Sequence, residues 1–273
     1  MTVDEIYNSI VYRVYGDTPN IPASTQAFLR GTSGLIAKAH RLLQLDSDYW
    51  FMRATQRYDI PELESQTGTV VAGNSTISGI DTTGMSVGMS IVSDAFPDET
   101  YITALTPLTA SNDATVTGNY TMGFYIKRVA LPADFKREKN VISMYSLNKY
   151  KLKRIVADEM IGYQWDLKSC LPQYYAFYNG YMYFESNITS ESTIILDYYK
   201  YIAYSDLDDY EDDVLIRGSD AIINYCCFSL ASLLKDFEKA RFFAQMYSDA
   251  LGQLRRENLM RESAFEEYQV RLL

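Results

Sequence analysis

Side chains able to carry out chemistry are few in this chain of 273 residues. Its only histidine is His40, which lies in a stretch of helical periodicity, far in sequence from a plausible nucleophile. Catalytic triads and Cys-His pairs would depend on that one imidazole, and a zinc site made of several histidines is excluded. We therefore expect His40 to be a packing or surface residue.

Thiol chemistry is also disfavoured by the pattern. The three cysteines, Cys170, Cys226 and Cys227, are too few for a disulfide framework. The adjacent pair falls inside an apolar helical pattern, where a thiol behaves as a small hydrophobic group. Structural packing is the expected role of this pair.

The acidic run at 206–213 is a candidate for calcium binding. It lacks the residue order and the distant glutamate of an EF-hand loop, so we expect a solvated acidic connection without a tight metal site. A glycosidase built on two carboxylates stays open, because the separation that identifies such a pair is spatial. Gly79, Gly84 and Gly88 do not have the spacing of a dinucleotide-binding loop.

The aromatic segment 174–184 could form a surface for stacking sugars or bases. Asn179-Gly180 divides it into two runs, and this dipeptide predicts a two-residue hairpin because a type I′ turn requires a positive φ at both central positions. In such a hairpin the aromatic side chains face one another across the strands, so we favour cross-strand packing as their role.

Charge argues against binding of duplex DNA in a groove. The net charge is −10 and the isoelectric point is about 4.7, whereas phosphate neutralisation requires a concentrated positive face. One basic run stands out, and we expect a solvated strand-and-loop surface, with contact to an acidic surface of another subunit as the alternative. The run comprises Lys136, Arg137, Lys139, Lys149, Lys151, Lys153 and Arg154.

The elements that position these groups begin with helices in residues 1–55. A capping box followed by apolar residues at helical spacing predicts the first helix, and a longer apolar pattern predicts a second from Pro22 to about Leu45. The N-terminus lacks the basic region of a signal peptide, and no window reaches the roughly 18 uninterrupted apolar residues of a spanning helix. The residues that identify the first helix are Thr2, Glu5, Ile6, Ile10 and Val14.

Residues 66–122 differ from the rest of the chain, being rich in Thr, Ser, Gly, Val and Ile with hardly any Lys or Arg. This composition is typical of short, half-exposed strands joined by turns, and it predicts an inserted all-β module. Residues 1–65 and 123–273 would then form one discontinuous core. Within it, segments 55–61 and 123–132 are expected to be neighbouring strands of one sheet.

Two closing helices are the best-specified elements. Ser219 is placed to cap the first, which is apolar on nearly all sides and should therefore be central. Asp236 supplies a turn and a cap for an amphipathic return helix, so an antiparallel αα-hairpin is predicted. The fold class is α+β: a helical bundle with a C-terminal αα-hairpin, an antiparallel β-sheet and an inserted small all-β domain.

Several short motifs follow one another in the second half of the chain. They are a Leu-Pro-Ala-Asp-Phe segment at 131–135, Leu171-Pro172 before the tyrosine hairpin, a Tyr-Tyr-Lys triplet at 198–200, the acidic run and the helical hairpin. This order resembles the head-to-tail adaptor proteins of tailed bacteriophages, the connector or tail tubular protein A-like family. Residues 79–92 are similar to a small β module found as an insertion in phage structural proteins.

The resemblance implies a non-enzymatic protein of the virion neck, assembled in the host cytoplasm, with no cofactor, metal or membrane. A dodecameric ring of this chain would sit under the portal protein, contact the tail nozzle or tail tube, and let DNA pass without specific binding, since an acidic lumen repels phosphates. The segment 255–273 would be mobile until it docks on the portal. The residues expected to bind the portal are Arg255, Arg256, Arg261, Phe265, Tyr268 and Leu272.

Two other classes of function stay open at this point. The first is a receptor- or carbohydrate-binding tail protein that acts through residues 66–122. The second is a tail-associated cell-wall hydrolase that would use a pair of carboxylates.

Overall fold

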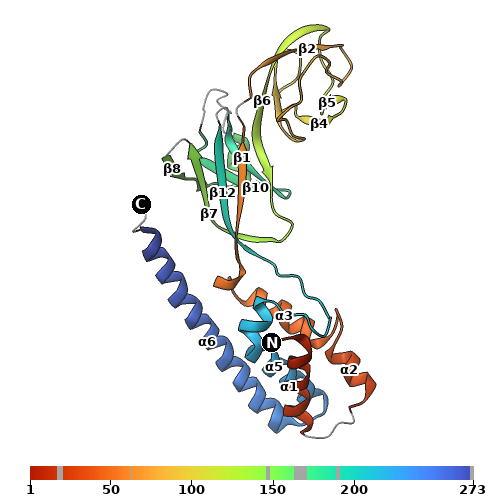
Figure 1. The fold of residues 1–273 in the computed structure, drawn as a ribbon, viewed down its shortest axis with the longest axis vertical. Coiled ribbons are helices and arrows are strands. Elements are labelled where there is room, and N and C mark those ends of the chain that lie inside the picture. Colours follow the sequence, from red (N-terminus) through yellow and green to blue (C-terminus); the bar gives the residue numbers. More distant parts are fainter. Residues whose placement is uncertain (17–20, 62, 146–147, 163–170, 189–190, 271–273) are drawn as a thin grey trace. The chain divides into compact units, whose positions relative to one another are not determined.

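The computed structural model describes residues 1–16, 21–61, 63–145, 148–162, 171–188 and 191–270, with side chains for all of these except 161, 162, 187 and 264–270. The chain divides into two units (Figure 1). The helical unit comprises Met1–Ala54 together with Tyr199–Leu273, and the β-rich unit comprises Thr55–Tyr198. The α+β class expected from the sequence is confirmed.

The helical unit begins as the sequence predicts. Thr2 and Glu5 exchange side-chain to backbone hydrogen bonds in a complete capping box, and the apolar stripe that follows is buried. The first predicted helix is therefore confirmed. The elements of this unit are α1 (Val3–Tyr15), α2 (Ala23–Leu29), α3 (Leu35–Asp46), the 3₁₀ turn η1 (Trp50–Met52), α5 (Asp213–Leu233) and α6 (Phe237–Val270).

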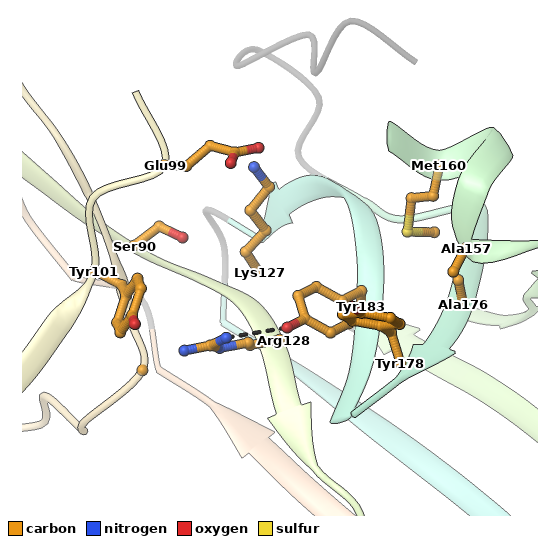
Figure 2. A pocket seen from close by; sticks show the side chains of 11 residues that line it. Ser90, Glu99, Tyr101, Lys127, Arg128, Ala157, Met160, Ala176, Tyr178 and Tyr183 are labelled. Carbon is orange, nitrogen blue, oxygen red and sulfur yellow. Dashed lines mark hydrogen bonds between the residues drawn. The ribbon is translucent and has the colours of Figure 1, made fainter. Parts of the chain in front are cut away.

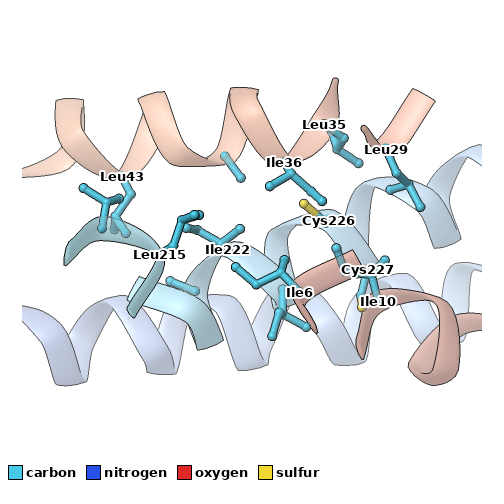
Figure 3. Close-up of a cluster of buried hydrophobic side chains, with 14 of the residues drawn as sticks. Ile6, Ile10, Leu29, Leu35, Ile36, Leu43, Leu215, Ile222, Cys226 and Cys227 are labelled. Carbon is cyan, nitrogen blue, oxygen red and sulfur yellow. The ribbon is translucent and has the colours of Figure 1, made fainter. Parts of the chain in front are cut away.

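The core of the helical unit forms around α5, which packs against α1, α3, α6 and η1. Figure 3 shows apolar side chains of several helices meeting there, and Ile6, Ile36 and Ile222 have no exposed surface. Cys226 and Cys227 are buried in the same cluster, which confirms their packing role. Helix α5 could cross a membrane by length and composition alone, but it is mostly buried here, as the core helix of a globular protein is.

The second predicted helix is in fact two, α2 and α3. Gly31 has a φ of 91°, which interrupts the helical backbone. Gly34 then closes a turn by donating its N–H to the Gly31 carbonyl at 3.0 Å, and a Cβ at this position would lie only 2.1 Å from the Arg30 carbonyl oxygen. The prediction of one helix from Pro22 to about Leu45 is wrong because this turn requires both glycines.

Helix α5 begins at Asp213 and not at Ser219. Asp212 is the N-cap, and its carboxylate accepts a hydrogen bond from the Leu215 N–H at 2.8 Å. Val214 and Leu215 are fully buried, so the first turn belongs to the apolar pattern of the helix. The prediction that Ser219 caps this helix is therefore wrong.

In the described residues, the β-rich unit holds three sheets. The six-stranded sheet has the order β2-β6-β11-β10-β9, with β3 also paired to β6; the four-stranded sheet has the order β1-β12-β7-β8, and β4 pairs with β5. The bounds are β1 (Arg53–Ile60), β2 (Gln66–Val70), β3 (Ser90–Val92), β4 (Ile102–Leu105), β5 (Leu108–Ala110), β6 (Gly118–Ala130), β7 (Phe135–Tyr145), β8 (Asn148–Lys151), β9 (Lys153–Arg154), α4 (Ala157–Gly162), β10 (Tyr174–Tyr178), β11 (Tyr181–Ile188) and β12 (Ser192–Lys200).

Strand β6 crosses the predicted boundary at residue 122 without a break. Its first half pairs with β2 and β3, and its second half pairs with β11. The expectation that segments 55–61 and 123–132 are neighbours in one sheet is wrong, because β12 pairs with β1 and β11 lies beside β6. The two segments still touch, since the Tyr58 hydroxyl donates to the Ala130 carbonyl at 2.7 Å.

The predicted tyrosine hairpin is confirmed. Strands β10 and β11 pair antiparallel, with Tyr178 opposite Tyr181. Asn179 has a φ of 47° and Gly180 a φ of 78°, as a type I′ turn requires. The sheet around the hairpin is mixed, because β9 pairs with β10 in parallel.

Candidate functional site

The C-terminal segment, the main site expected from the sequence, is part of one helix of 34 residues, α6. Asn258 is buried and ties α6 to η1, since its Oδ1 accepts from the Trp50 N–H at 2.7 Å and its Nδ2 donates to the Asp48 carbonyl at 3.1 Å. Arg255 forms a bidentate ion pair with Asp46, in which Nε donates to Oδ2 at 3.1 Å and Nη2 donates to Oδ1. The expected mobile segment is therefore anchored through these residues.

The next turn of α6 continues this anchorage. The guanidinium of Arg261 lies 4.2 Å from the centre of the Trp50 ring, a cation–π geometry. Glu262 accepts a hydrogen bond from the Tyr199 hydroxyl at 3.0 Å, and burial together with this carboxylate raises the pKa of Tyr199. Arg255 and Arg261, two of the expected portal-binding arginines, thus have partners within the helical unit.

The opposite face of α6 is open. Arg256, Leu259 and Met260 recur at helical spacing on this face, and Leu259 and Met260 are 70% and 71% exposed. We call these three residues the outer face of α6. Sequence reasoning missed Leu259 and Met260, although two adjacent apolar residues outside the core stripe were a signal. Of the other expected portal-binding residues, Phe265 and Tyr268 lie in α6 with side chains that are not described, and Leu272 lies outside the described residues.

The turn between α5 and α6 exposes further apolar groups. Asp236 caps α6 as predicted, its carboxylate accepting from the Lys239 N–H at 3.1 Å. Large apolar side chains around the turn and on the first turns of α6 remain in water, which is unusual for a monomer when such groups are close together. They are Leu233, Leu234, Phe237, Phe242 and Met246.

The acidic run at 206–213 is only partly solvated. Asp208 pairs with Arg30, which also binds Asp4. Asp212 is half-buried, with only 9% of its side chain exposed, and its Oδ2 accepts from His40 Nε2 and from the Tyr210 hydroxyl, both at 2.9 Å. The expectation of a solvated loop is therefore wrong for Asp212, because its carboxylate is needed inside as a cap and as the partner of the buried imidazole.

Gln44 fixes the tautomer of this imidazole. Its amide forms two hydrogen bonds with the backbone of Ile202, accepting from N–H at 2.7 Å and donating to C=O at 3.0 Å. This pairing directs Nε2 of Gln44 toward His40 Nδ1, 3.1 Å away, so Nδ1 accepts and Nε2 of His40 carries the proton. Burial acts to raise the pKa of Asp212, but hydrogen bonds from His40, Leu215 and Tyr210 outweigh it and lower that pKa.

The two cysteines of α5 are inert thiols, and the part of the chain that the structure describes holds no cluster of metal ligands. Burial raises the pKa of the Cys227 thiol to about 12 and raises that of Cys226 as well, so both stay protonated near neutral pH. No group of three or more His, Cys, Asp or Glu side chains among the described residues could hold a metal ion. Cys170 lies outside the described residues.

The aromatic hairpin divides into a packed and an open part. Tyr175 and Phe184 are buried and Phe177 packs against Phe135, which confirms cross-strand and core packing for these rings. Tyr178, next to the turn, is 57% exposed. The basic run predicted as a solvated surface lies on β7, β8 and β9; its members from Lys149 to Arg154 are exposed, and Arg154 pairs with Glu138.

A cavity of about 270 Å³ opens beside the hairpin in the β-rich unit (Figure 2). Arg128 lines this cavity and donates a hydrogen bond to the Tyr183 hydroxyl at 3.0 Å, and its guanidinium lies 4.5 Å from the Tyr101 ring centre and 4.7 Å from that of Tyr181. We call Arg128 and these three tyrosines the arginine cage. Sequence reasoning did not find it, because the members come from segments far apart in the chain.

In the described part of the helical unit, charged and polar groups mainly bind one another, whereas α6 exposes large apolar side chains. This combination is typical of structural proteins that assemble with others. Comparison with known families gives the particular one. Residues 1–268 match the family model described as SU10 adaptor protein, so the chain belongs to that family. No curated protein matches the chain. The resemblance to phage adaptors is thereby confirmed, and with it a structural role as a virion component.

Proposed function

We propose that this chain is the repeating subunit of a head-to-tail ring that joins the portal protein to the tail nozzle or tail tube. Membership of the adaptor family supports a structural role of this kind. The observation that carries the proposal is the series of exposed apolar side chains along α6 and the turn before it. Soluble monomers rarely leave so many large apolar groups in water, and partner subunits would cover them.

The portal contact is proposed to use the outer face of α6. Arg255 and Arg261 are engaged with Asp46 and Trp50, so their role is to hold the helix in place, and the open side is left for the partner. An arginine beside two apolar side chains suits a groove that has a carboxylate at its edge. The proposed set is Arg256, Leu259 and Met260, continued by Phe265, Tyr268 and Leu272.

The ring itself is proposed to form from repeated contacts between copies, dodecameric by resemblance, through the apolar residues near the α5–α6 turn. Assembly would take place in the host cytoplasm and would end in the neck of the virion. Five carboxylates of the acidic run are exposed, Asp206, Asp208, Asp209, Glu211 and Asp213, and Asp208 among them pairs with Arg30. Facing a lumen, they would repel passing DNA and prevent it from adhering.

Residues 66–122 are proposed to form an inserted module within the β-rich unit. A buried apolar cluster of its own supports this, with Val70, Ile91 and Ile102 at its centre. Met122 and Phe124 of β6 belong to the same cluster, so the module is proposed to share β6 with the sheet that follows it.

The portal contact can be tested with the portal protein from the same phage genome. A Leu259→Glu/Met260→Glu variant should lose co-elution with the portal ring in size-exclusion chromatography with light scattering, because two charges replace the apolar contact. Asn148→Glu is the matched control, since Asn148 is exposed and lies on β8, outside α6. This control variant gains a charge without losing an apolar side chain, and its Kd for the portal should stay within about threefold of the wild-type value.

Two results would overturn this assignment. One is native portal binding by the double variant. The other is absence of any complex between the wild-type chain and the portal under conditions where both are folded by circular dichroism.

A further inference from the structure

The cavity beside the tyrosine hairpin has an apolar floor and a polar rim. Ala157, Met160 and Ala176 form the floor, and Figure 2 shows Ser90 and Glu99 on the opposite side. A volume of about 270 Å³ is near the lower limit for small-molecule sites. The space therefore suits one small ring and excludes a folded peptide segment.

The lining carries two cations, Lys127 and Arg128, and one anion, Glu99. Figure 2 shows the Lys127 ammonium and the Glu99 carboxylate pointing toward one another. Burial lowers the pKa of Lys127, and the charges of Glu99 and Asp98 act against that shift. Glu99 has a φ of 62°, a left-handed backbone conformation that costs about 1 kcal/mol or more in a residue other than glycine. Such strain collects at functional positions.

The walls are aromatic and fixed in place. Tyr183 and Tyr101 are held by Arg128, so these two rings need little reorganisation to receive a ligand. Tyr178, with 57% of its surface exposed, also lines the cavity and leaves an open aromatic face on that side.

The chemistry of the lining restricts the ligand. A purely apolar ligand would bury Lys127 and Glu99 without supplying hydrogen bonds, and the desolvation free energy of these two charges would oppose its binding. The guanidinium of Arg128 is already engaged with the Tyr183 hydroxyl and with the rings of Tyr101 and Tyr181. An ionic ligand in the remaining space would be attracted by one of Lys127 and Glu99 and repelled by the other. A sugar ring avoids both penalties, because each hydroxyl both donates and accepts and its C–H face is apolar enough to stack on tyrosine.

We propose that this cavity binds one uncharged pyranose ring, as the terminal residue of a glycan. Tyr178 stacks on the C–H face, Glu99 accepts from the sugar hydroxyls, and Lys127 and Ser90 donate to them. This inference does not depend on ring formation or portal binding, and the monomeric full-length chain is sufficient to test it.

The test is ligand-observed saturation-transfer NMR on the full-length chain with the methyl glycosides of glucose, galactose and N-acetylglucosamine. At least one glycoside should bind saturably with a Kd of about 1 mM. Tyr178→Ala and Glu99→Gln should each weaken that binding by about tenfold or more, whereas Tyr178→Phe should retain it. Tyr150→Ala is the matched control, because Tyr150 is an exposed tyrosine of β8 outside the cavity.

Competing ligand classes are included as arms of the same experiment. Tighter binding of p-cresol, an apolar aromatic probe, or of glucuronate, an anionic sugar, than of every glycoside would overturn the proposal. So would the absence of saturation for all three glycosides up to about 20 mM. Equal loss in Tyr150→Ala and Tyr178→Ala, with both variants folded by circular dichroism, would place the binding elsewhere and would also refute it.

Discussion

Removing the Asn258 side chain tests whether α6 is fastened to the rest of the helical unit. In Asn258→Ala the Trp50 N–H and the Asp48 carbonyl lose their partners. A buried donor or acceptor left without a hydrogen bond destabilises the fold, and because both residues are half-buried we take the lower end of this cost, about 1 kcal/mol for each group. Alanine is a better helix former than asparagine and returns about 0.5 kcal/mol. The expected net loss is about 1.5 kcal/mol, or a decrease in Tm of about 5 °C.

Tryptophan fluorescence measures this loss selectively. The chain has two tryptophans, and a Trp165→Phe background leaves Trp50, beside Asn258, as the only residue that emits when tryptophan is excited selectively. Thermal and urea unfolding of Asn258→Ala in this background report on the helical unit alone. Gln253→Ala is the matched control, because Gln253 is an exposed polar residue of the same helix, and its unfolding free energy should change by less than about 0.5 kcal/mol.

Unfolding of Asn258→Ala at the temperature of its parent would refute the docking of α6 on η1. The same reasoning changes how the C-terminal segment should be studied. Deleting residues 256–273 also removes Asn258 and Glu262, so the truncated chain should be less stable as well as deficient in portal binding. Substitutions on the outer face of α6 are therefore the cleaner test of the proposed contact.

Three further outcomes are expected. Hydrogen bonding lowers the pKa of Asp212 in the folded chain. Its ionised carboxylate therefore contributes fully to the free energy of unfolding above the unfolded pKa of about 3.9, and this contribution is lost as pH falls through the lower folded pKa. Acid unfolding of Asp212→Asn should lack this loss, and a pH profile identical to that of wild type would contradict the assignment. Gly218→Ala should destabilise the chain by about 1 kcal/mol in urea, since the new Cβ would lie 2.1 Å from a Leu43 methyl; a more stable variant would disprove the close packing. Replacing 67–121 with a Gly/Ser linker should leave the Trp50 unfolding transition intact, and its disappearance would show that 66–122 is not a separable module.

Local signals in the sequence predicted the ends and turns of several elements. The capping box at Thr2 and the hairpin at Asn179-Gly180 each depend on a few adjacent residues, so neighbours in the sequence contain all the necessary information. The break between α2 and α3 was missed because the apolar pattern of a helix continues across Gly31. Its positive φ becomes decisive only when the turn is closed by Gly34.

Strand pairing could not be predicted in the same way. The partners of β1 and β6 are chosen by packing between distant segments, and an alternation pattern is equally compatible with several neighbours. Asn258 shows the same limit at the candidate site. Its role depends on backbone groups about two hundred positions earlier in the chain, and no residue near it indicates that they are there.

The continuity of β6 has a mechanical consequence. A strand of 13 residues at about 3.3 Å per residue extends for about 40 Å. Tension applied to β2 or β3 therefore passes through their hydrogen bonds to β6, along the continuous backbone of β6, and through its hydrogen bonds to β11. No flexible linker lies on that path. The ladders on both halves of β6 would be loaded along the strand direction, so several hydrogen bonds must fail together before the two parts separate. The chain is built to transmit a pull between these two parts of its β-rich unit without a hinge in β6.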